Sequence, residues 1–442
     1  MADETRIRLM AGDCLEHLQQ MAPASVDAIC IDPPAGISFM GKAWDSDRGG
    51  RDAWIGWLSG IMAELLRVTK PGGHMLCWAL PRTQHWTATA IEDAGWQVRD
   101  VLMHIFGSGF PKSASVPIGI DKQAGAMGHR GKAHHGHATG EVANGRENLN
   151  APHAMPGHDG ITPEAKQWAG WGTALKPSHE AWILARKPLA ETVAATVLEH
   201  GTGALNIDGC RVGTSETLGR TNNGREQYSP SSFCMATDDR QRFDKSDHAG
   251  GRWPPHLLLS HGPGCGETCE DGCPVAEMDA QSGVSPAKPQ REGRQGGGRG
   301  VVQFGTGGGA SGVWPADSGG GASRFFPVFR YAAKPSTAEK SAGLDGRNEH
   351  ATVKSIELMR WLVRLITPPD GLVLDCFMGS GTTGIAAVLE GARFVGIEQR
   401  PEMVEVARQR IAYWETGADI DAPAAPDAGD GRTGPRQMGL FG

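Results

Sequence analysis

The sequence predicts an α/β protein whose core is formed by two blocks of alternating strands and helices at opposite ends of the chain. The first block covers residues 5–110, and the second runs from Val353 through Ile411. Residues 111–333 lie between them, are rich in Gly, His, Asn and Pro, and lose the alternation. Because 442 residues exceed the usual size of a domain, we expect one large domain with insertions, or two domains.

Apolar periodicity predicts the individual elements. The expected strands are Ile7–Leu9, Ala28–Ile31 and His74–Leu80, the last entered through a turn at Pro71–Gly73. The expected helices are Cys14–Met21, Ala53–Leu66 and Val353–Ile366, and an ordered island is expected at Ala181–His200.

Composition excludes several classes of protein. Hydrophobic residues make up 39% of the chain, enough for a core, and the 63 glycines cluster between Gly293 and Gly321. No apolar run reaches the roughly 18 residues that a membrane helix needs. No signal peptide is recognisable at Met1, so we expect a protein of the bacterial cytoplasm. Nine cysteines, an odd number, indicate free thiols or metal ligands rather than disulfides.

Near the end of the chain, a strand is followed by a glycine turn and the start of a helix. Leu372–Leu374 is the predicted strand, and Asp375 lies at its carboxyl end, where open α/β sheets bind ligands. The glycines let the backbone approach a ligand, and free N–H groups at the helix start suit an anionic group. The residues expected to form this site are Asp375, Gly379, Gly381, Thr382 and Thr383.

A second predicted strand identifies the kind of ligand. Arg393–Ile397 ends in Glu398, 23 residues after Asp375, close to the roughly 20-residue offset at which an acid meets ribose hydroxyls. No Gly-Lys-Ser/Thr follows the glycine turn, which disfavours a phosphate-binding loop. The sequence therefore predicts a nucleoside cofactor.

These residues carry a family resemblance. Val373–Thr383, which includes Phe377, resembles motif I of the S-adenosylmethionine-dependent amino-methyltransferases of DNA, with Cys376 in place of the usual Pro. Asn348–Ser355 resembles motif X of that family, with Ala351 and Ser355 replacing two usual prolines. Motif X packs against the methionine part of the cofactor in the family, so the resemblance implicates Thr352 and Lys354 in cofactor binding.

Near the start of the chain, Asp32-Pro33-Pro34 follows a predicted buried strand. An exocyclic amino group on adenine or cytosine is a poor nucleophile because its lone pair is delocalised into the ring. Asp32 can accept one N–H and act as general base, while the carbonyl of Pro33, held by the stiff prolines, can accept the other. A strand that simply ends in a turn is the structural alternative for this tripeptide.

The tripeptide resembles motif IV of the same methyltransferases, in which an aromatic residue follows and stacks on the flipped base. This chain has Ala35 at that position. Phe39 or Trp44 could supply the missing ring, a contact that contributes roughly 1–3 kcal/mol per base, or either could pack in the core.

The order of the motifs, catalytic segment first and cofactor segment last, resembles the β subgroup of the family and implies a circularly permuted Rossmann-like fold.

Asp13 matches the acid of motif III near the cofactor adenine, and it is equally a candidate helix N-cap. Phe106–Ser113 and Leu175–Glu180 resemble phage-borne members. No Pro-Cys nucleophile loop is visible, which disfavours cytosine-C5 methylation.

We expect four regions. They are the catalytic half of the core (1–112), an insertion for target recognition (113–333) with an ordered island at 168–212, the cofactor half (334–414), and a disordered tail (415–442).

The middle region holds a candidate metal site. His261, Cys265, Cys269 and Cys273 offer four soft ligands within thirteen residues, inside the candidate zinc loop 256–273. Unmetallated loop thiols are the alternative. The histidines at 129, 134, 135 and 137 lie in glycine-rich sequence and are expected in a loop rather than a second site.

Two further segments predict macromolecular partners. The net charge of −7 argues against nucleic acid, but residues 281–334 carry seven basic and two acidic residues. The candidate DNA-contacting residues are Arg291, Arg294, Arg299 and Arg324, with solvated loop charges as the alternative. The terminus, with Gln437, Leu440 and Phe441, resembles a bacterial sliding-clamp-binding peptide, or it is a frayed apolar end.

These residues and the family resemblance together imply a site-specific methyltransferase that moves a methyl group from S-adenosylmethionine to the amino group of a flipped base in double-stranded DNA. Adenine N6 is favoured over cytosine N4 because Asp begins the tripeptide. A homologue impaired by Ala35 that only binds DNA or the cofactor remains open, as does an RNA or protein methyltransferase.

Overall fold

The computed structural model describes residues 6–107, 109, 113–126, 160–213, 251–262, 264–266, 268–286, 291–292, 313–314, 319–329, 337–346, 348, 350 and 353–417. Several predicted residues lie outside these ranges: Thr352, Arg294, Arg299, Gln437, Leu440, Phe441 and the histidines between 129 and 137. Arg291 is described as part of a strand, without its side chain.

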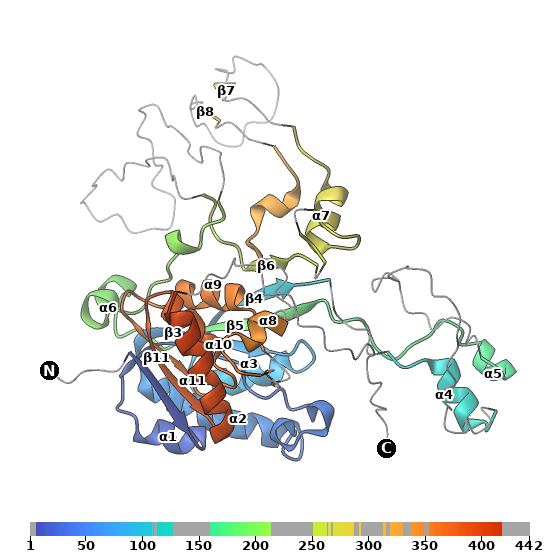
Figure 1. The fold of residues 1–442 in the computed structure, drawn as a ribbon, viewed down its shortest axis with the longest axis horizontal. Helices are drawn as coiled ribbons and strands as arrows, with labels where there is room; N and C mark the ends of the chain where they lie inside the picture. Colours follow the sequence, from blue (N-terminus) through green and yellow to red (C-terminus); the bar gives the residue numbers. More distant parts are fainter. Residues whose placement is uncertain are drawn as a thin grey trace, which may run out of the picture.

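Within the described residues, nine strands form one mixed sheet (Figure 1), which confirms the predicted α/β class. Their order across the sheet is β1 (Ile7–Ala11), β11 (Arg393–Glu398), β10 (Leu372–Asp375), β2 (Val26–Ile31), β3 (Thr69–Ala79), β5 (His179–Arg186), β4 (Gln97–Ile105), β6 (Leu257–Ser260) and β9 (Val328–Phe329). The first five run parallel, and β5 is antiparallel to both its neighbours. Strands from both ends of the chain therefore share one sheet, with β10 and β11 between β1 and β2.

Helices cover both faces of this sheet, as a Rossmann-like fold requires. The helices are α1 (Cys14–Gln20), α2 (Arg51–Val68), α3 (Gln84–Asp93), α4 (Val116–Gln123), α5 (Pro163–Lys166), α6 (Val193–His200), α7 (Pro274–Ser282), α8 (Thr337–Ser341), α9 (Ile356–Ile366), α10 (Thr382–Leu389) and α11 (Pro401–Glu415). Short 3-10 turns are η1 (Phe39–Gly41), η2 (Ala43–Asp45), η3 (Asp208–Cys210) and η4 (Ala322–Phe325), and a separate hairpin pairs β7 (Arg291–Glu292) with β8 (Val313–Trp314).

Strand β2 shows how the two faces divide the core. Ala28 and Cys30 pack with α9, α10 and α11, whereas Ile29 and Ile31 pack with α1, α2 and α3. All six residues of β2 are buried because both faces of the strand are covered.

Two element boundaries differ from the sequence prediction. The expected turn at Pro71–Gly73 was wrong, because β3 already begins at Thr69 and absorbs the glycines as an irregularity in its pairing with β2. Gly72 has a φ of +74°, which glycine adopts without strain. Helix α9 begins at Ile356 rather than Val353, since Ser355 has extended backbone at its N-cap.

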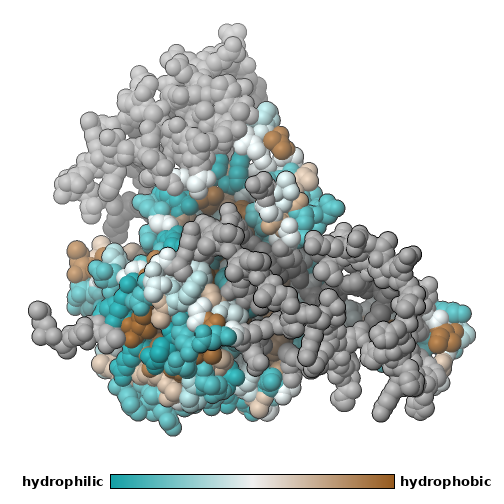
Figure 2. All heavy atoms as spheres, in the orientation of Figure 1, coloured by the Kyte–Doolittle hydropathy of each residue, from teal (hydrophilic) through white to brown (hydrophobic). Residues whose placement is uncertain are grey.

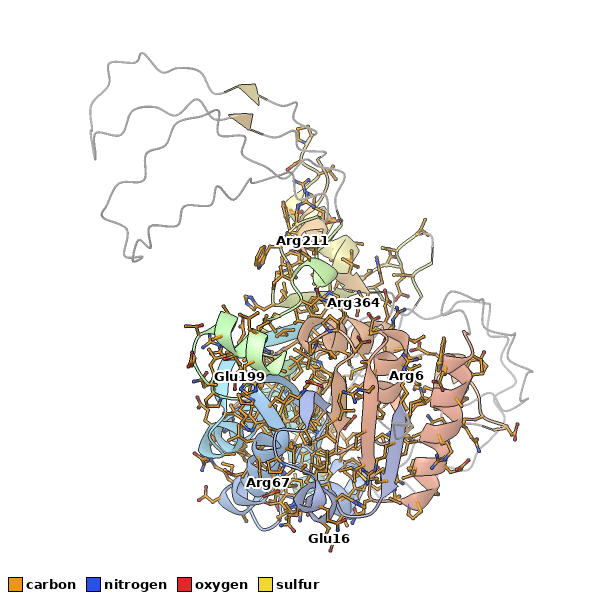
Figure 3. The ribbon with its side chains drawn as sticks, turned by 90° about the vertical axis from the view of Figure 1, so that its left-hand side faces the viewer. Arg6, Glu16, Arg67, Glu199, Arg211 and Arg364 are labelled. Atoms are coloured by element: carbon orange, nitrogen blue, oxygen red, sulfur yellow. The ribbon has the colours of Figure 1, made fainter. Side chains whose placement is uncertain are left out.

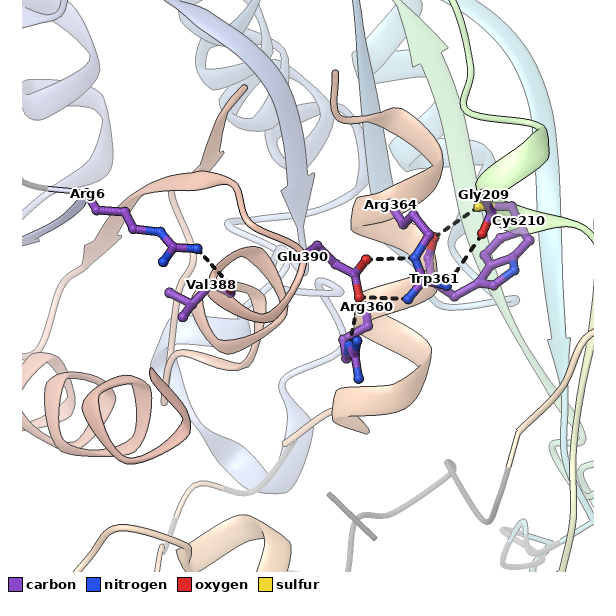
Figure 4. A network of polar contacts seen from close by, with 8 residues as sticks. All are labelled: Arg6, Gly209, Cys210, Arg360, Trp361, Arg364, Val388 and Glu390. Atoms are coloured by element: carbon purple, nitrogen blue, oxygen red, sulfur yellow. Dashed lines mark hydrogen bonds and ion pairs between the residues drawn. The ribbon is translucent and has the colours of Figure 1, made fainter. Parts of the chain in front are cut away.

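A polar network joins the C-terminal helices (Figure 4). Glu390, at the end of α10, accepts hydrogen bonds of 2.7 Å from the Nε atoms of Arg360 and Arg364 on α9. Arg6, just before β1, donates to the carbonyl of Val388 at 2.8 Å and so ties the first strand to the same helix. These contacts hold the two ends of the chain together.

Two smaller structures project from the core. The arm formed by α4 and α5 lies to one side in Figure 1, and buried Asp121 accepts from the backbone N–H of Ile161 at 2.7 Å to join its two segments. The segment with β6, α7 and η4 lies above the core, and Arg211 and Arg364 mark this junction in Figure 3. The surface in Figure 2 is largely hydrophilic over the core, with scattered apolar patches. No helix among the described residues is long and apolar enough to span a membrane.

Candidate active site

A cavity of about 880 Å³ opens at the carboxyl ends of the parallel strands β1, β2, β10 and β11. It brings the two predicted half-sites together. The predicted residues on its wall are Asp13, Asp32, Pro34, Phe39, Trp44, Lys354, Asp375, Phe377, Gly379, Thr382, Thr383 and Glu398. Pro33 is buried beside this wall, and Gly381 lies at the N-cap of α10.

Asp375 is enclosed by the start of the segment that follows β10. One carboxylate oxygen accepts from the N–H of Phe377 at 2.9 Å, and the other accepts from the hydroxyl of Thr383 at 2.6 Å. Burial raises the pKa of Asp375 to about 7, although both hydrogen bonds act to lower it. Because both oxygens are already used within the chain, this carboxylate shapes the turn.

The glycine turn brings backbone close to the cavity. Gly379 has a φ of +54°, and a Cβ there would lie 2.9 Å from Nε2 of His350. Its N–H donates to Oε2 of Glu398 at 3.0 Å, which links the glycine turn to the end of β11. Gly381 has a φ of +84°, so both positions favour glycine.

Asp13 is the N-cap of α1, the structural alternative considered from the sequence. Its carboxylate accepts from the N–H groups of Leu15 at 2.8 Å and Glu16 at 3.3 Å. The same residue lines the cavity, so capping fixes its position on the wall.

Asp32 lies at the carboxyl end of β2 beside a buried cation. Nζ of Lys354 is 3.3 Å from Oδ2 of Asp32 and 3.3 Å from Oε2 of Glu180, which is at the start of β5. The ammonium also lies 4.1 Å from the ring centroid of Trp78. Burial raises the pKa of Asp32 to about 6, and the charge of Lys354 opposes that rise.

The loop after the tripeptide is organised by Asp45. This carboxylate is 1% exposed and accepts from the backbone N–H groups of Gly36 at 3.0 Å and Phe39 at 2.8 Å, with further bonds from Ala35 and Ile37. The loop therefore carries both candidate rings into the cavity wall, and Trp44 keeps 43% of its surface exposed. Neither Phe39 nor Trp44 is a core residue, which disfavours the core-packing alternative.

Sequence reasoning missed four residues of this site: Trp78, Glu180, Asp45 and His350. Glu180 and His350 lie inside the segments that carried the resemblance, so their polarity beside those motifs was an available signal. The role of Asp45 depends on the loop closing back on itself, and that of Trp78 on a contact with Lys354, which is distant in sequence; no local pattern revealed either.

The predicted metal ligands converge above the core. The ligand atoms of His261, Cys265, Cys269 and Cys273 all lie within 4.8 Å of one another. Nδ1 of His261 is 3.4 Å from Sγ of Cys269 and 3.6 Å from Sγ of Cys273. A tetrahedral zinc ion with bonds of about 2.0 Å to nitrogen and 2.3 Å to sulfur would separate these atoms by about 3.5 Å, so the donor set fits zinc.

Of the predicted DNA-contacting arginines, Arg324 is described with its side chain. It donates to the carbonyl of Gly320 at 2.8 Å, and its guanidinium lies 4.7 Å from the ring centroid of Phe325. The structure therefore places Arg324 beside an exposed aromatic ring on η4.

Comparisons with known proteins locate the similarity. Residues 241–409 match the model of the DNA methylase family. Over 64 residues the chain is 38% identical to the type II methyltransferase M.BglI of Bacillus subtilis, covering 14% of this chain and 18% of that protein. Over 69 residues it is 42% identical to M1.MboII of Moraxella bovis, covering 16% and 26%. The matches thus span about a fifth to a quarter of these relatives.

Among solved structures, the PvuII DNA methyltransferase, described as cytosine-N4-specific, covers 92% of this chain and 88% of its own at 12% identity and a TM-score of 0.42.

Proposed function

We propose that this protein is an S-adenosylmethionine-dependent DNA methyltransferase that modifies the exocyclic amino group of a flipped base. The observation that carries the proposal is the cavity shared by Asp32, at the end of β2, and the glycine turn, at the end of β10. The match of residues 241–409 to the DNA methylase family supports it independently.

The cavity wall fits the cofactor. Gly379 lines the cavity without a side chain, and Gly381, where a Cβ would lie 2.8 Å from that of Ala407, lets the start of α10 pack closely against α11 behind it. Asp13, Phe377 and Glu398 would hold the nucleoside, and Thr382 and Thr383 line the same wall. S-adenosylmethionine supplies an electrophilic methyl group when bound.

The catalytic half of the cavity acts on the target nitrogen. Asp32 accepts one N–H of the amino group, and the carbonyl of Pro33 accepts the other, which favours a pyramidal nitrogen with its lone pair available. Asp32 then takes the proton that this nitrogen must lose. Phe39 and Trp44 offer ring faces for the extruded base, in place of the aromatic that Ala35 lacks.

Transfer of tritium from labelled cofactor to DNA tests the proposal. The wild-type protein should label duplex DNA, and Asp32→Ala should not. Label on RNA or protein alone would favour those substrates, and cofactor binding without any transfer would favour the impaired homologue. Hydrolysis of the labelled DNA decides between adenine N6, which we favour, and cytosine N4.

The second part of the proposal is a structural zinc ion held by His261, Cys265, Cys269 and Cys273. The matching interatomic separations support it, and an N–H of Glu270 donates to Sγ of Cys265 at 3.3 Å, as expected for a thiolate ligand. Metal analysis of protein purified without chelator should find about one zinc per chain, and Cys265→Ser should lower that content. Metal-free protein of equal stability would contradict the site.

The arginine-rich segment 281–334 and the terminal residues Gln437, Leu440 and Phe441 are proposed as contacts for DNA and for a sliding clamp. Arg324→Ala should weaken binding to DNA of any sequence and reduce its dependence on salt. A peptide of residues 437–442 should bind a purified bacterial clamp, and no shift at about tens of micromolar would refute that contact.

A further inference from the structure

The ion pair at Asp32 involves three charged groups rather than two. Asp32 directly follows β2, Glu180 lies at the start of β5, and Lys354 precedes α9, so folding brings together residues as much as about 300 positions apart in the sequence. Lys354 lies equally far, 3.3 Å, from the two carboxylates. Its side chain is 14% exposed, and those of Asp32 and Glu180 are each 25% exposed.

The equal distances have a consequence for the base. A carboxylate paired exclusively with an ammonium has its lone pairs occupied and its basicity lowered. Glu180 contacts the same ammonium, so its negative charge offsets part of the stabilisation that Lys354 gives to the carboxylate of Asp32. Burial raises the pKa of Glu180, but the charge and hydrogen bond of Lys354, together with the other polar groups around the carboxylate, lower it below its usual value and keep Glu180 ionised.

We propose that Glu180 is a positioning residue that shares Lys354 with Asp32, and thereby leaves Asp32 basic enough to take the proton of the target amine. The inference rests on the proposed function. In the step concerned, an N–H bond of the methylated nitrogen breaks, its electron pair stays on nitrogen, and the proton forms an O–H bond with Asp32. The proton then passes to water.

The other titratable groups facing these three do not replace them. Asp45 and Asp375 face Asp32, and both carry the wrong charge to stabilise its carboxylate. Cys30 and Cys77 lie beside it as buried thiols whose pKa values are raised by burial. His104 faces Glu180 and His350 faces Lys354, and burial lowers the pKa of each imidazole to about 4, so both are neutral at physiological pH.

The acid limb of the pH profile of kcat is the pH range in which activity falls because Asp32 becomes protonated. Two substitutions should therefore move this limb in opposite directions. Glu180→Gln removes a negative charge near Asp32, so the limb should move about one unit below its wild-type position near pH 6. The rate constant kcat at its plateau should fall about tenfold, because Lys354 then pairs exclusively with a less basic Asp32. Lys354→Gln should move the limb about one unit higher, and its activity should recover at alkaline pH.

The experiment measures kcat and the KM for DNA from pH 5 to 9.5, with Glu199→Gln on exposed α6 as the matched control. The control should leave the profile unchanged. Opposite shifts of the limb, with thermal unfolding midpoints near wild type, support the proposal. Shifts in the same direction, no shifts, or loss of stability alone would overturn it, since a merely structural role for Glu180 does not alter the titration of Asp32.

The pKa of Asp32 can also be measured without catalytic turnover. With ¹³C-carboxyl-labelled aspartate, the Asp32 signal, assigned by its loss in Asp32→Asn, can be titrated in all four proteins. A result in which the Asp32 pKa moves in opposite directions in Glu180→Gln and Lys354→Gln, while the wild-type protein methylates no DNA, would refute the proposed function. That result would still support the sharing of Lys354 between Asp32 and Glu180. Equal pKa values in an active enzyme would refute the charge sharing alone.

Discussion

The two halves of the cavity use their carboxylates differently. In the half from the end of the chain, Asp375 and Glu398 accept hydrogen bonds from the hydroxyl of Thr383 and from the backbone N–H groups of Phe377, Gly379 and Arg400. In the half from the start, Asp32 contacts the ammonium of Lys354, which it shares with Glu180. The cofactor half is thus shaped by internal hydrogen bonds, while the catalytic half keeps a carboxylate whose protonation can change during a reaction.

The catalytic half should show the largest effect on the chemical step. Asp32→Asn keeps the shape of the side chain but removes the base, so kcat should fall by about 10²–10⁴-fold. Binding of S-adenosylmethionine, measured by calorimetry, should change little. Equal losses in kcat and in cofactor affinity would remove the distinction between the halves.

A substitution in the cofactor half should lower the affinity for S-adenosylmethionine. Gly379→Ala adds a Cβ 2.9 Å from His350 at a φ of +54°, so the turn must distort. We expect the Kd for S-adenosylmethionine to rise about tenfold or more, with kcat at saturating cofactor closer to wild type. Gly41→Ala is the control for positive φ without a clash, because no atom lies within 4 Å of the Cβ that alanine would add. This variant should leave the affinity for S-adenosylmethionine unchanged.

Removing either candidate stacking ring should have an intermediate effect, which is expected in the KM for DNA. Trp44→Ala should raise the KM for DNA by about 5- to 100-fold if its exposed indole stacks on the base, from roughly 1–3 kcal/mol per stack. Phe39→Ala measures the same contact for the other ring. A fluorescent base analogue at the target position should report less flipping in whichever variant removes the stacking ring.

The smallest effect on catalysis is expected at the Glu390 network, which lies outside the cavity. Glu390→Ala leaves Arg360 and Arg364 without this carboxylate and should lower the free energy of unfolding by about 2 kcal/mol, measured by urea denaturation. Burial alone would raise the pKa of Glu390, but its arginine partners lower it below its usual value. The stabilisation is therefore present at neutral pH and should be lost as pH falls through that lowered pKa. Activity per folded molecule should stay near wild type.

Local chemistry made much of the core predictable. The strands at Ala28–Ile31 and Leu372–Leu374 are apolar because both faces of the sheet are covered, and the helix at Thr382 follows a glycine turn. Asp32 and Asp375 were found because each lies at the carboxyl end of a predicted strand, where open α/β sheets bind ligands. The predicted turn at Pro71–Gly73 failed because these residues form an irregular stretch within β3, between its paired positions Thr69 and His74.

Sequence by itself determined the residue types of the site: the glycines, the carboxylates at strand ends, the Asp-Pro-Pro tripeptide and the four metal-type ligands. Only the tertiary structure decided which of them meet. Lys354 looked like a cofactor residue in its own motif, yet its ammonium lies between Asp32 and Glu180. Asp45 showed no signal until folding buried it among the N–H groups of the loop after Pro34. Spacing along a chain predicts contacts within one turn or strand end, whereas the contacts of Lys354 depend on the order of strands in the sheet and those of Asp45 on how its loop folds back.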